Sequence, residues 1–263
     1  MSPYIALFNA RLLTLIQYRV AAFAGFLTQI FWGLIKTMIL TAFFLEAKGP
    51  EPITLMQGIT FIWLGQGFLQ LLPWNIDKEI ESDIRSGNVA YELVRPLDLY
   101  SLWFARALAM RVVLTLMRSP FLLLIAFLFF GLPLPDSFLS GLAFLGSLCL
   151  AALLSSAITT LVHITLFWTL SGEGILRLLP HFTIVLSGLV VPLPLFPEWM
   201  KPVINSQPFR GIIDIPSRIY TGVIPASEVL FYYAFQAFWI LSLVLLGKFL
   251  IGRALKKVVI QGG

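Results

Sequence analysis

Charged residues are scarce in this sequence. Asp, Glu, Lys and Arg make up 12% of the 263 residues, whereas 59% are hydrophobic and the mean hydropathy is +0.91. A soluble globular domain is typically about a quarter charged, and a water-soluble fold could not hide this much apolar surface. The scarcity of charge therefore excludes an ordinary soluble domain and predicts a protein surrounded mainly by lipid.

Cysteine and histidine are also rare. Cys149 is the single cysteine, so no internal disulfide is expected, and no Cys/His cluster has metal-ligand spacing. His163 and His181 each stand in an apolar segment without an acid or a cysteine at helical spacing, which favours a hydrogen-bonded packing role. No metal site is predicted.

The motifs of nucleotide hydrolysis and of nucleophilic or zinc catalysis are absent from the sequence. It contains no G-x-x-x-x-G-K-[ST], no G-x-S-x-G and no H-E-x-x-H. We therefore predict no catalytic or cofactor-binding residue and expect that the chain is not an enzyme. The net charge of +5 does not indicate a nucleic-acid partner either, because the cations are scattered singly rather than gathered in a basic run.

Long apolar runs predict the fold class, an all-α polytopic membrane protein with six transmembrane helices. A helix needs roughly 20 residues to cross the hydrocarbon layer, and its backbone polar groups must bond to one another there. The runs also lack the strict alternation of barrel strands. With no internal repeat, they predict a single domain over residues 1–263. The six expected spans are 20–45, 53–72, 102–130, 138–170, 175–195 and 229–251.

The first residues predict a helix of another kind. Apolar side chains between Ile5 and Ile16 recur at helical spacing, while polar side chains occupy other positions around the helix. This pattern is typical of an amphipathic helix on the membrane surface, here over residues 1–19.

The distribution of Lys and Arg predicts the orientation, because cytoplasmic connections carry an excess of both. With both termini in the cytoplasm, twelve cations fall on the inner side and four on the outer side. The inner set is Arg11, Arg19, Lys78, Arg85, Arg95, Arg106, Arg111, Arg177, Lys248, Arg253, Lys256 and Lys257, and the outer set is Lys48, Lys201, Arg210 and Arg218.

The inner connection over residues 75–100 is rich in acids and patterned. Ile76, Ile80 and Ile84 recur every four residues and predict a short charged helix with one apolar stripe. Gly87 is well placed to end this helix, and Pro96 disfavours helix at Arg95. The segment is either a solvated surface helix or a docking element for a cytoplasmic partner, and its length and patterning favour docking.

The outer connection over residues 191–228 is too apolar for a free loop and too rich in proline for an uninterrupted span. Short broken helices that dip back into the outer leaflet would suit it, if protein covers their irregular backbone. An ordinary extracellular cap is the alternative.

Some ionisable groups fall within the expected spans. A charge at the bilayer centre costs at least about 3 kcal/mol, so such groups usually face a protein interior or a cavity, or reach the interface. Arg106 and Arg111 lie near the inner surface and are expected to snorkel. Lys36, with Gln29 on roughly the same face, and Arg118 lie deeper, so these three are candidates for a pathway or a subunit interface.

The segment Ile84–Arg111, IRSGNVAYELVRPLDLYSLWFARALAMR, resembles the stretch after the second span in ABC transporter permeases of the type-2 exporter class. It is especially similar to a six-span branch known as viologen exporter permeases, whose marker reads roughly [IV]-R-[ST]-G-x-[IVL]-[AD]-x-x-L-[ILV]-R-P-[LV]. Arg85, Gly87, Leu93, Arg95 and Pro96 fill that marker. In layout the resemblance covers essentially the whole chain.

The resemblance implies a mechanism. Two permeases would pair, as a homodimer or with a sister subunit, in the cytoplasmic membrane of a bacterial cell. Two copies of a cytoplasmic ABC ATPase would bind ATP and Mg²⁺ and dock on the segment around the short charged helix. The implied ATPase-coupling residues are Asp77, Glu79, Glu81, Arg85, Gly87, Arg95 and Pro96.

Two other classes stay open. A secondary transporter driven by an ion gradient would need paired acids within spans or inverted repeats with broken helices in both halves, and neither pattern is present. A membrane-embedded enzyme acting on lipids would place the Asp214–Arg218 region and His181 near one site.

Overall fold

The computed structural model describes residues 6, 9–10, 13–14, 19–47, 49, 51–74, 76–169 and 173–256. Within these ranges the regular structure is entirely helical, which confirms the predicted all-α class. The expected surface helix over residues 1–19 lies largely outside the described residues. The α-helices are α2 (Arg19–Glu46), α3 (Leu55–Gly67), α4 (Lys78–Ser86), α5 (Val89–Leu93), α6 (Leu99–Phe130), α7 (Phe138–Thr165), α8 (Glu173–Leu186), α9 (Lys201–Ser206), α10 (Asp214–Tyr220) and α11 (Val229–Leu255).

Four helical stretches among the described residues are long and apolar enough to cross a membrane, at 25–46, 99–130, 138–165 and 226–255. The other two expected spans coincide with shorter helices. The span expected at 53–72 contains α3 followed by a 3₁₀ turn at Leu69–Leu71, and the span expected at 175–195 contains α8. The structure is thus that of a multi-pass membrane protein.

Side chains of the connecting segments fix where the helices begin. Thr54 and Gln57 form a capping box on α3, in which Thr54 Oγ1 accepts from the Gln57 amide at 3.2 Å and Gln57 Oε1 accepts from the Thr54 amide at 2.8 Å. Asp98 caps α6 by accepting from the Ser101 amide at 2.8 Å. These caps satisfy amides that have no partner within their own helix.

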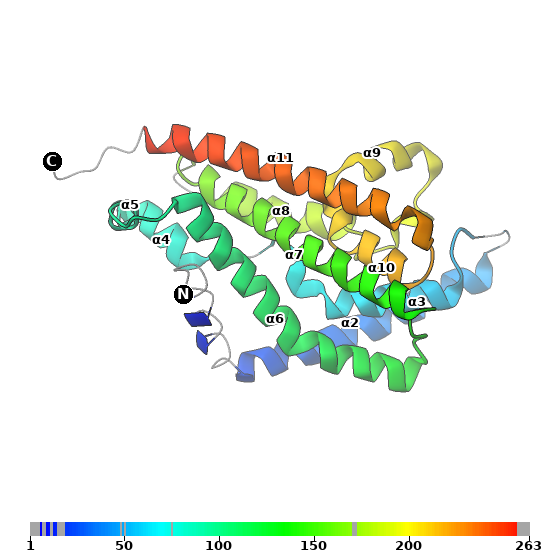
Figure 1. Cartoon of the computed structure of the whole chain (residues 1–263). Coiled ribbons are helices and arrows are strands. Elements are labelled where there is room, and N and C mark those ends of the chain that lie inside the picture. Colours follow the sequence, from blue (N-terminus) through cyan, green and yellow to red (C-terminus); the bar gives the residue numbers. More distant parts are fainter. Residues whose placement is uncertain are drawn as a thin grey trace.

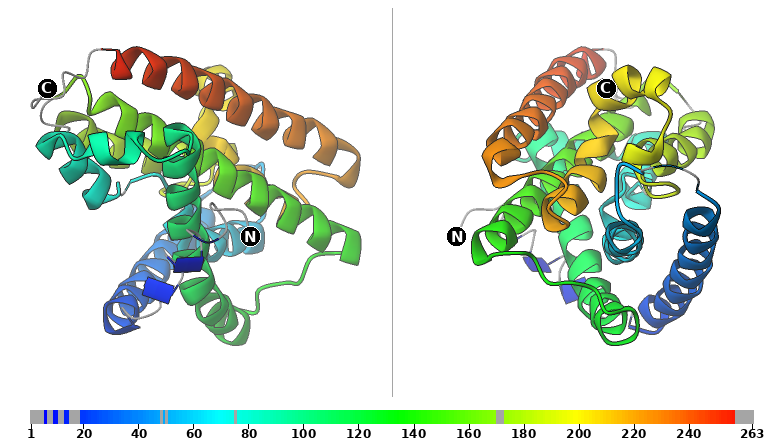
Figure 2. Two further views of the ribbon diagram at one scale, coloured as in Figure 1. Left: turned by 60° about the vertical axis from the view of Figure 1, so that its left-hand side comes forward. Right: turned by 90° about the vertical axis from the view of Figure 1, so that its right-hand side faces the viewer.

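The helices run between two ends of the molecule (Figure 1). At one end, α4 and α5 lie beside the start of α6 and the end of α11; at the other, α10 lies beside the starts of α3 and α11. Figure 2 shows α7 and α11 side by side along much of their length, with α2 and the last turns of α6 on the opposite side of the bundle. The main hydrophobic core lies where α7 meets α3, α10 and α11.

Small and polar side chains allow close helix packing. A Cβ at Gly247 of α11 would lie 2.5 Å from the Tyr100 ring of α6, so the absence of a side chain lets these helices approach. Gln236 of α11 is fully buried and donates to the Ser147 carbonyl at 3.1 Å and the Gly211 carbonyl at 2.7 Å. It therefore ties α11 both to α7 and to the segment before α10.

The expected outer connection contains short pieces of helix. Besides α9 and α10, it includes 3₁₀ turns at Leu193–Leu195, Glu198–Met200, Pro208–Gly211 and Ala226–Glu228. Ile212, Ile213 and Ile215 are buried in the main core, so the protein covers much of this irregular backbone.

Candidate functional site: the connection between α3 and α6

The short charged helix predicted between the second and third expected spans is present as α4. The carboxylate of Asp77 caps it by accepting from the Glu79 amide at 3.0 Å. Ile80 is buried against α6 and Ile84 packs beside it. The four-residue spacing of isoleucines therefore corresponds to an apolar face of α4 that packs against the protein. Gly87 ends the helix in the left-handed region at φ 78°, which glycine adopts without steric cost.

Arg106 of α6 pairs with acids of both short helices of this connection. Arg106 is only 6% exposed, and its Nη2 donates to Asp77 Oδ2 at 2.7 Å and to Glu79 Oε2 at 2.8 Å. Its Nε reaches Asp77 Oδ2 at 3.0 Å, while its Nη1 approaches Glu92 Oε1 at 3.4 Å. The guanidinium therefore joins both α4 and α5 to the first turns of α6. Buried charges are stable only when they are paired in this way.

Two further side chains complete this group. Trp103 of α6 donates from Nε1 to Glu92 Oε2 at 2.8 Å, and His163 of α7 accepts at Nε2 from the Asp77 amide at 3.0 Å. His163 is fully buried, with its ring edge-on to Trp103, so the predicted hydrogen-bonded packing role is confirmed. We call Asp77, Glu79, Glu92, Trp103, Arg106 and His163 the Arg106 cluster.

The prediction that Arg106 and Arg111 snorkel to the membrane surface is wrong. Both are buried in protein, Arg111 completely. Arg111 donates to the Gln70 carbonyl at 3.4 Å and to Thr159 Oγ1 at 3.1 Å. The sequence predicted cations at the inner end of the span, but Arg106 pairs with acids and Arg111 donates to a carbonyl and a hydroxyl of other segments of the chain.

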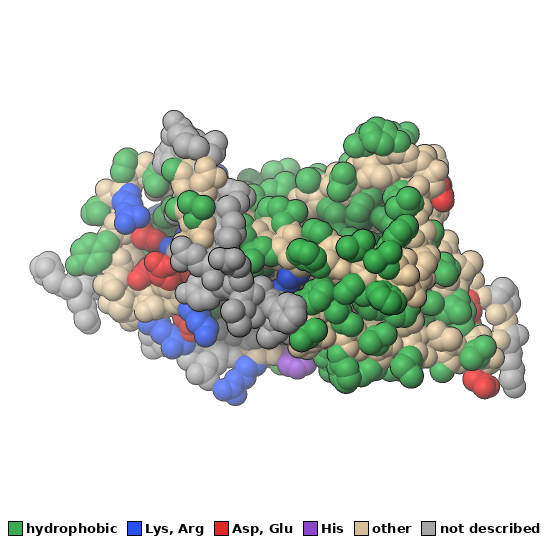
Figure 3. All heavy atoms as spheres, turned by 90° about the horizontal axis from the view of Figure 1, so that it is seen from below, with side chains coloured by type: hydrophobic (Ala, Val, Ile, Leu, Met, Phe, Trp, Pro, Cys, Tyr) green, Lys and Arg blue, Asp and Glu red, His purple; other side chains and the backbone are tan. Residues whose placement is uncertain are grey.

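The solvent side of the connection carries different chemistry. Glu81 and Arg85 form an i,i+4 ion pair at 2.7 Å, beside a shallow depression lined also by Lys78, Ser82 and Ser86. In α5 and directly after it, Tyr91, Leu93 and Val94 expose apolar side chains, 72% and 83% for Tyr91 and Val94. In Figure 3 most of the charged side chains in view gather at one end of the molecule, a few acids lie at the other end, and the surface between is largely hydrophobic.

The charged residues predicted for coupling at α4 thus divide into two groups. Asp77 and Glu79 pair with Arg106, whereas Glu81 and Arg85 pair with each other. Arg95 and Pro96 are exposed in the turn before α6, where the Leu97 amide bonds the Arg95 carbonyl at 2.8 Å. Sequence reasoning missed Arg106, Glu92 and Trp103 as members of one site. A usable signal was an arginine at the start of a span that follows a connection rich in acids.

The three deeper polar residues lie elsewhere, each against another segment of the same chain. Lys36 Nζ donates to the Leu189 carbonyl at 2.8 Å, and Gln29 Nε2 donates to the Gln66 carbonyl at 3.0 Å. The Arg118 guanidinium of α6 lies against Gly25 of α2, where an added Cβ would approach its Nη1 to 2.7 Å. Their role in a pathway or a subunit interface stays a prediction.

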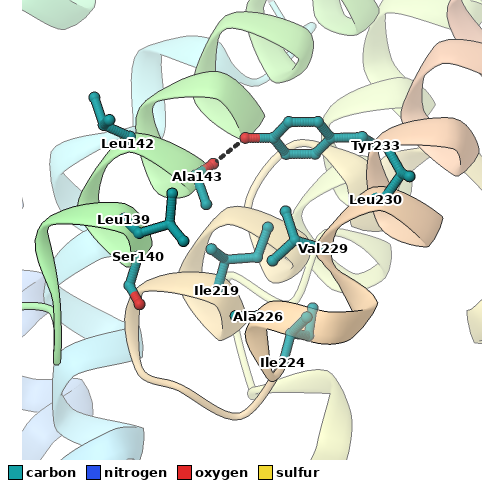
Figure 4. A pocket seen from close by; sticks show the side chains of 10 residues that line it. All are labelled: Leu139, Ser140, Leu142, Ala143, Ile219, Ile224, Ala226, Val229, Leu230 and Tyr233. Atoms are coloured by element: carbon teal, nitrogen blue, oxygen red, sulfur yellow. Dashed lines mark hydrogen bonds between the residues drawn. The ribbon is translucent and has the colours of Figure 1, made fainter.

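The end of the molecule opposite α4 and α5 has an apolar pocket of about 370 Å³ between α7, α10 and α11. Figure 4 shows its lining, in which Tyr233 donates to the Ala143 carbonyl at 2.5 Å. Ser140 and Tyr233 supply its side-chain hydroxyls, and the other lining side chains are apolar. Among the described residues, no group of three or more His, Cys, Asp or Glu could hold a metal ion.

The long apolar helices define a polytopic membrane protein. At one end of it, Arg106 binds the charged connection between α3 and α6 to the first turns of α6. Residues 51–262 match the family described as ABC-2 family transporter protein, and the chain belongs to that family. It is a membrane component of transport rather than a catalytic one, so the resemblance to ABC permeases is confirmed at the level of the family. No curated protein matches the chain.

Proposed function

We propose that this chain is the membrane-spanning permease subunit of an ABC exporter and that the connection over residues 75–100 docks a separate cytoplasmic ATPase. The observation that carries the proposal is the Arg106 cluster. It fixes a charged helix rigidly to two of the candidate spans, α6 through Arg106 and α7 through His163. A push on α4 is therefore delivered to both, as a rigid-body motion requires.

The solvent side of the connection supports docking. A charged surface with an ion pair lies next to exposed Tyr91 and Val94, and exposed apolar side chains rimmed by polar ones are typical of interaction sites. ATP and Mg²⁺ would be bound by the ATPase, with α4 transmitting its closure.

The remaining architecture follows from the same proposal. In it α3 and α8 complete six spans, both termini face the cytoplasm of a bacterial cell, and the segment over 191–228 re-enters the outer leaflet. Two permeases, identical or sister subunits, pair around the pathway. The marker filled by Arg85, Gly87, Leu93, Arg95 and Pro96 supports membership of the branch of viologen exporter permeases.

Reversing the charges on the solvent side of α4 should weaken ATPase binding. The double variant Glu81→Lys with Arg85→Glu keeps an i,i+4 ion pair but inverts the charge presented to a partner. Like charges brought together weaken an interface. We expect roughly tenfold less cassette ATPase to co-purify with the tagged chain, which corresponds to a loss of about 1.4 kcal/mol, measured by quantitative mass spectrometry.

Glu198→Lys with Lys201→Glu is the matched control, because these residues form an i,i+3 ion pair away from the connection. Glu79 is unsuitable for this test since it also contacts Arg106. Equal recovery of the ATPase with both double variants would show that α4 is not the docking element.

A further inference from the structure

A second ionic group lies near the start of α11, away from the Arg106 cluster. Asp214 is fully buried, and its Oδ2 lies 3.5 Å from Arg210 Nη2 and 3.6 Å from Arg218 Nη1. Among the described residues, Asp214 is the acid within ion-pair distance of these two arginines. One carboxylate thus faces two guanidiniums, and one positive charge is left without a counter-charge in a largely buried place, which is costly.

The two guanidiniums also have unused donors. Arg210 Nη1 is occupied by the side-chain and main-chain oxygens of Asn205, at 2.8 and 3.2 Å. The Nε atoms of Arg210 and Arg218 are buried, and neither has a hydrogen-bond partner within the described part of the chain. A guanidinium offers five N–H donors in a planar fork that matches the oxygens of a phosphate or a carboxylate. Within the described part of the chain, the two Asp214 oxygens have no hydrogen-bond partner either. The surplus positive charge therefore favours an anion, and the unused N–H donors can bind it.

A cavity of about 280 Å³ adjoins these groups and is lined by Asn205, Arg210, Arg218, Phe231, Tyr232 and Phe235. This volume far exceeds what one water needs and approaches that of small-ligand sites. Arg210 lies over the rings of Tyr232 and Phe235, at 5.6 and 5.5 Å from their centroids. Such cation–π contacts use the planar face of the guanidinium, whereas its N–H donors point outward in the plane of the group. These donors can therefore still bind an anion.

The position of the cavity favours an amphiphilic anion. Its three aromatic residues belong to the first two turns of α11, which open the candidate span over 226–255. At 1.5 Å per residue they lie within about 10 Å of the start of that helix, at the level where lipid headgroups and interfacial aromatic rings are found. Phe231 is largely exposed, so the mouth of the cavity borders the surface that faces lipid.

We propose that the cavity between α9, α10 and the start of α11 binds a phosphate group, that of an anionic phospholipid, through Arg210 and Arg218. The phosphate supplies the missing negative charge and accepts from the unused N–H donors, while the aromatic rings contact the glycerol and the first acyl carbons. This site is independent of ATPase docking, so either assignment can fail without the other.

Phosphatidylglycerol added to the full chain, purified in detergent and stripped of lipid, tests the proposal. Native mass spectrometry should show binding of phosphatidylglycerol in preference to zwitterionic phosphatidylcholine, and only the former should raise the melting temperature. Arg218→Gln should weaken phosphatidylglycerol binding by about tenfold or more, since it removes a charge-assisted hydrogen bond. Arg218→Lys keeps the positive charge but not the planar fork of N–H donors. Its affinity for phosphatidylglycerol should therefore lie between that of the wild type and that of Arg218→Gln.

Arg253→Gln is the matched control, because Arg253 is an exposed arginine at the opposite end of α11; it should bind as the wild type does. Inorganic phosphate forms a separate arm. Protection by phosphatidylglycerol alone assigns the cavity to a lipid, and equal protection by inorganic phosphate assigns the same anion site to a soluble phosphate. Unchanged binding in both Arg218 variants, or equal binding of the two lipids, would overturn the proposal.

Discussion

Arg106→Gln will loosen the whole connection between α3 and α6. The variant removes the guanidinium that pairs with Asp77, Glu79 and Glu92, so the largely buried carboxylates of Asp77 and Glu92 lose this cation. Breaking a buried ion pair by removing one member costs about 3–5 kcal/mol. If the free energy of local opening of α4 and α5 falls by about 3 kcal/mol, their amides should exchange about a hundredfold faster. Hydrogen–deuterium exchange of the purified chain measures this.

Arg253→Gln also serves as the control here, since this exposed arginine belongs to the last turn of α11, and α11 ends at the same end of the molecule as α4 (Figure 1). Its exchange in α4 and α5 should match that of the wild type. Arg106→Lys keeps one positive charge but cannot reach three carboxylates in the same geometry, so its exchange should be intermediate. If exchange in α4 and α5 is unchanged in Arg106→Gln, the arginine does not anchor the connection.

Asp214→Ala will destabilise the segment before α11. Two arginines would then face each other in a largely buried place without their acid, and such a loss also costs about 3–5 kcal/mol. We expect a melting temperature several degrees below that of the wild type when tryptophan fluorescence is followed in detergent, together with faster exchange of the amides of α10.

Glu228→Gln is the matched control, because Glu228 is an exposed acid just before α11. Anionic lipid should restore part of the stability lost in Asp214→Ala if it supplies the missing negative charge, and this restoration would link the two observations at this site. A melting temperature equal to that of Glu228→Gln would show that the ionic group does not hold the segment together.

Local patterns predicted α4 well because its determinants are local. The spacing of Ile76, Ile80 and Ile84 fixes its apolar stripe, and Gly87 alone supplies the left-handed residue that ends it. Composition predicted the lipid environment for an equally simple reason, since hydropathy summed over a long run does not depend on how the helices pack.

The site itself depends on contacts between residues far apart in the chain. Arg106 meets Asp77 across 29 residues, and the Asp77 amide meets His163 across 86. No sequence spacing encodes these pairs, so the sequence does not show that Asp77, Glu79 and Glu92 of the connection pair with Arg106. The same limitation misplaced Arg111, whose partners Gln70 and Thr159 come from other segments.

Hydropathy also does not show where an apolar run stops being α-helical. The run over 53–72 continues past the end of α3 at Gly67 into a 3₁₀ turn, and the run over 175–195 continues past the end of α8 at Leu186. The residues after these ends remain apolar because they pack in the protein core: Leu71, Leu72 and Leu189 are buried there. Apolar length therefore overstates the length of these two helices.

Docking of a cytoplasmic ATPase on α4 requires α4 to face the compartment in which ATP is hydrolysed, and cysteine labelling in intact cells tests this most directly. In a Cys149→Ser background, a single cysteine is placed at exposed Ser82 of α4 or at exposed Val203 of α9. A membrane-impermeant maleimide should label position 203 in intact cells and position 82 only after the membrane is permeabilised. Labelling of position 82 from outside intact cells would contradict the proposed docking of a cytoplasmic ATPase.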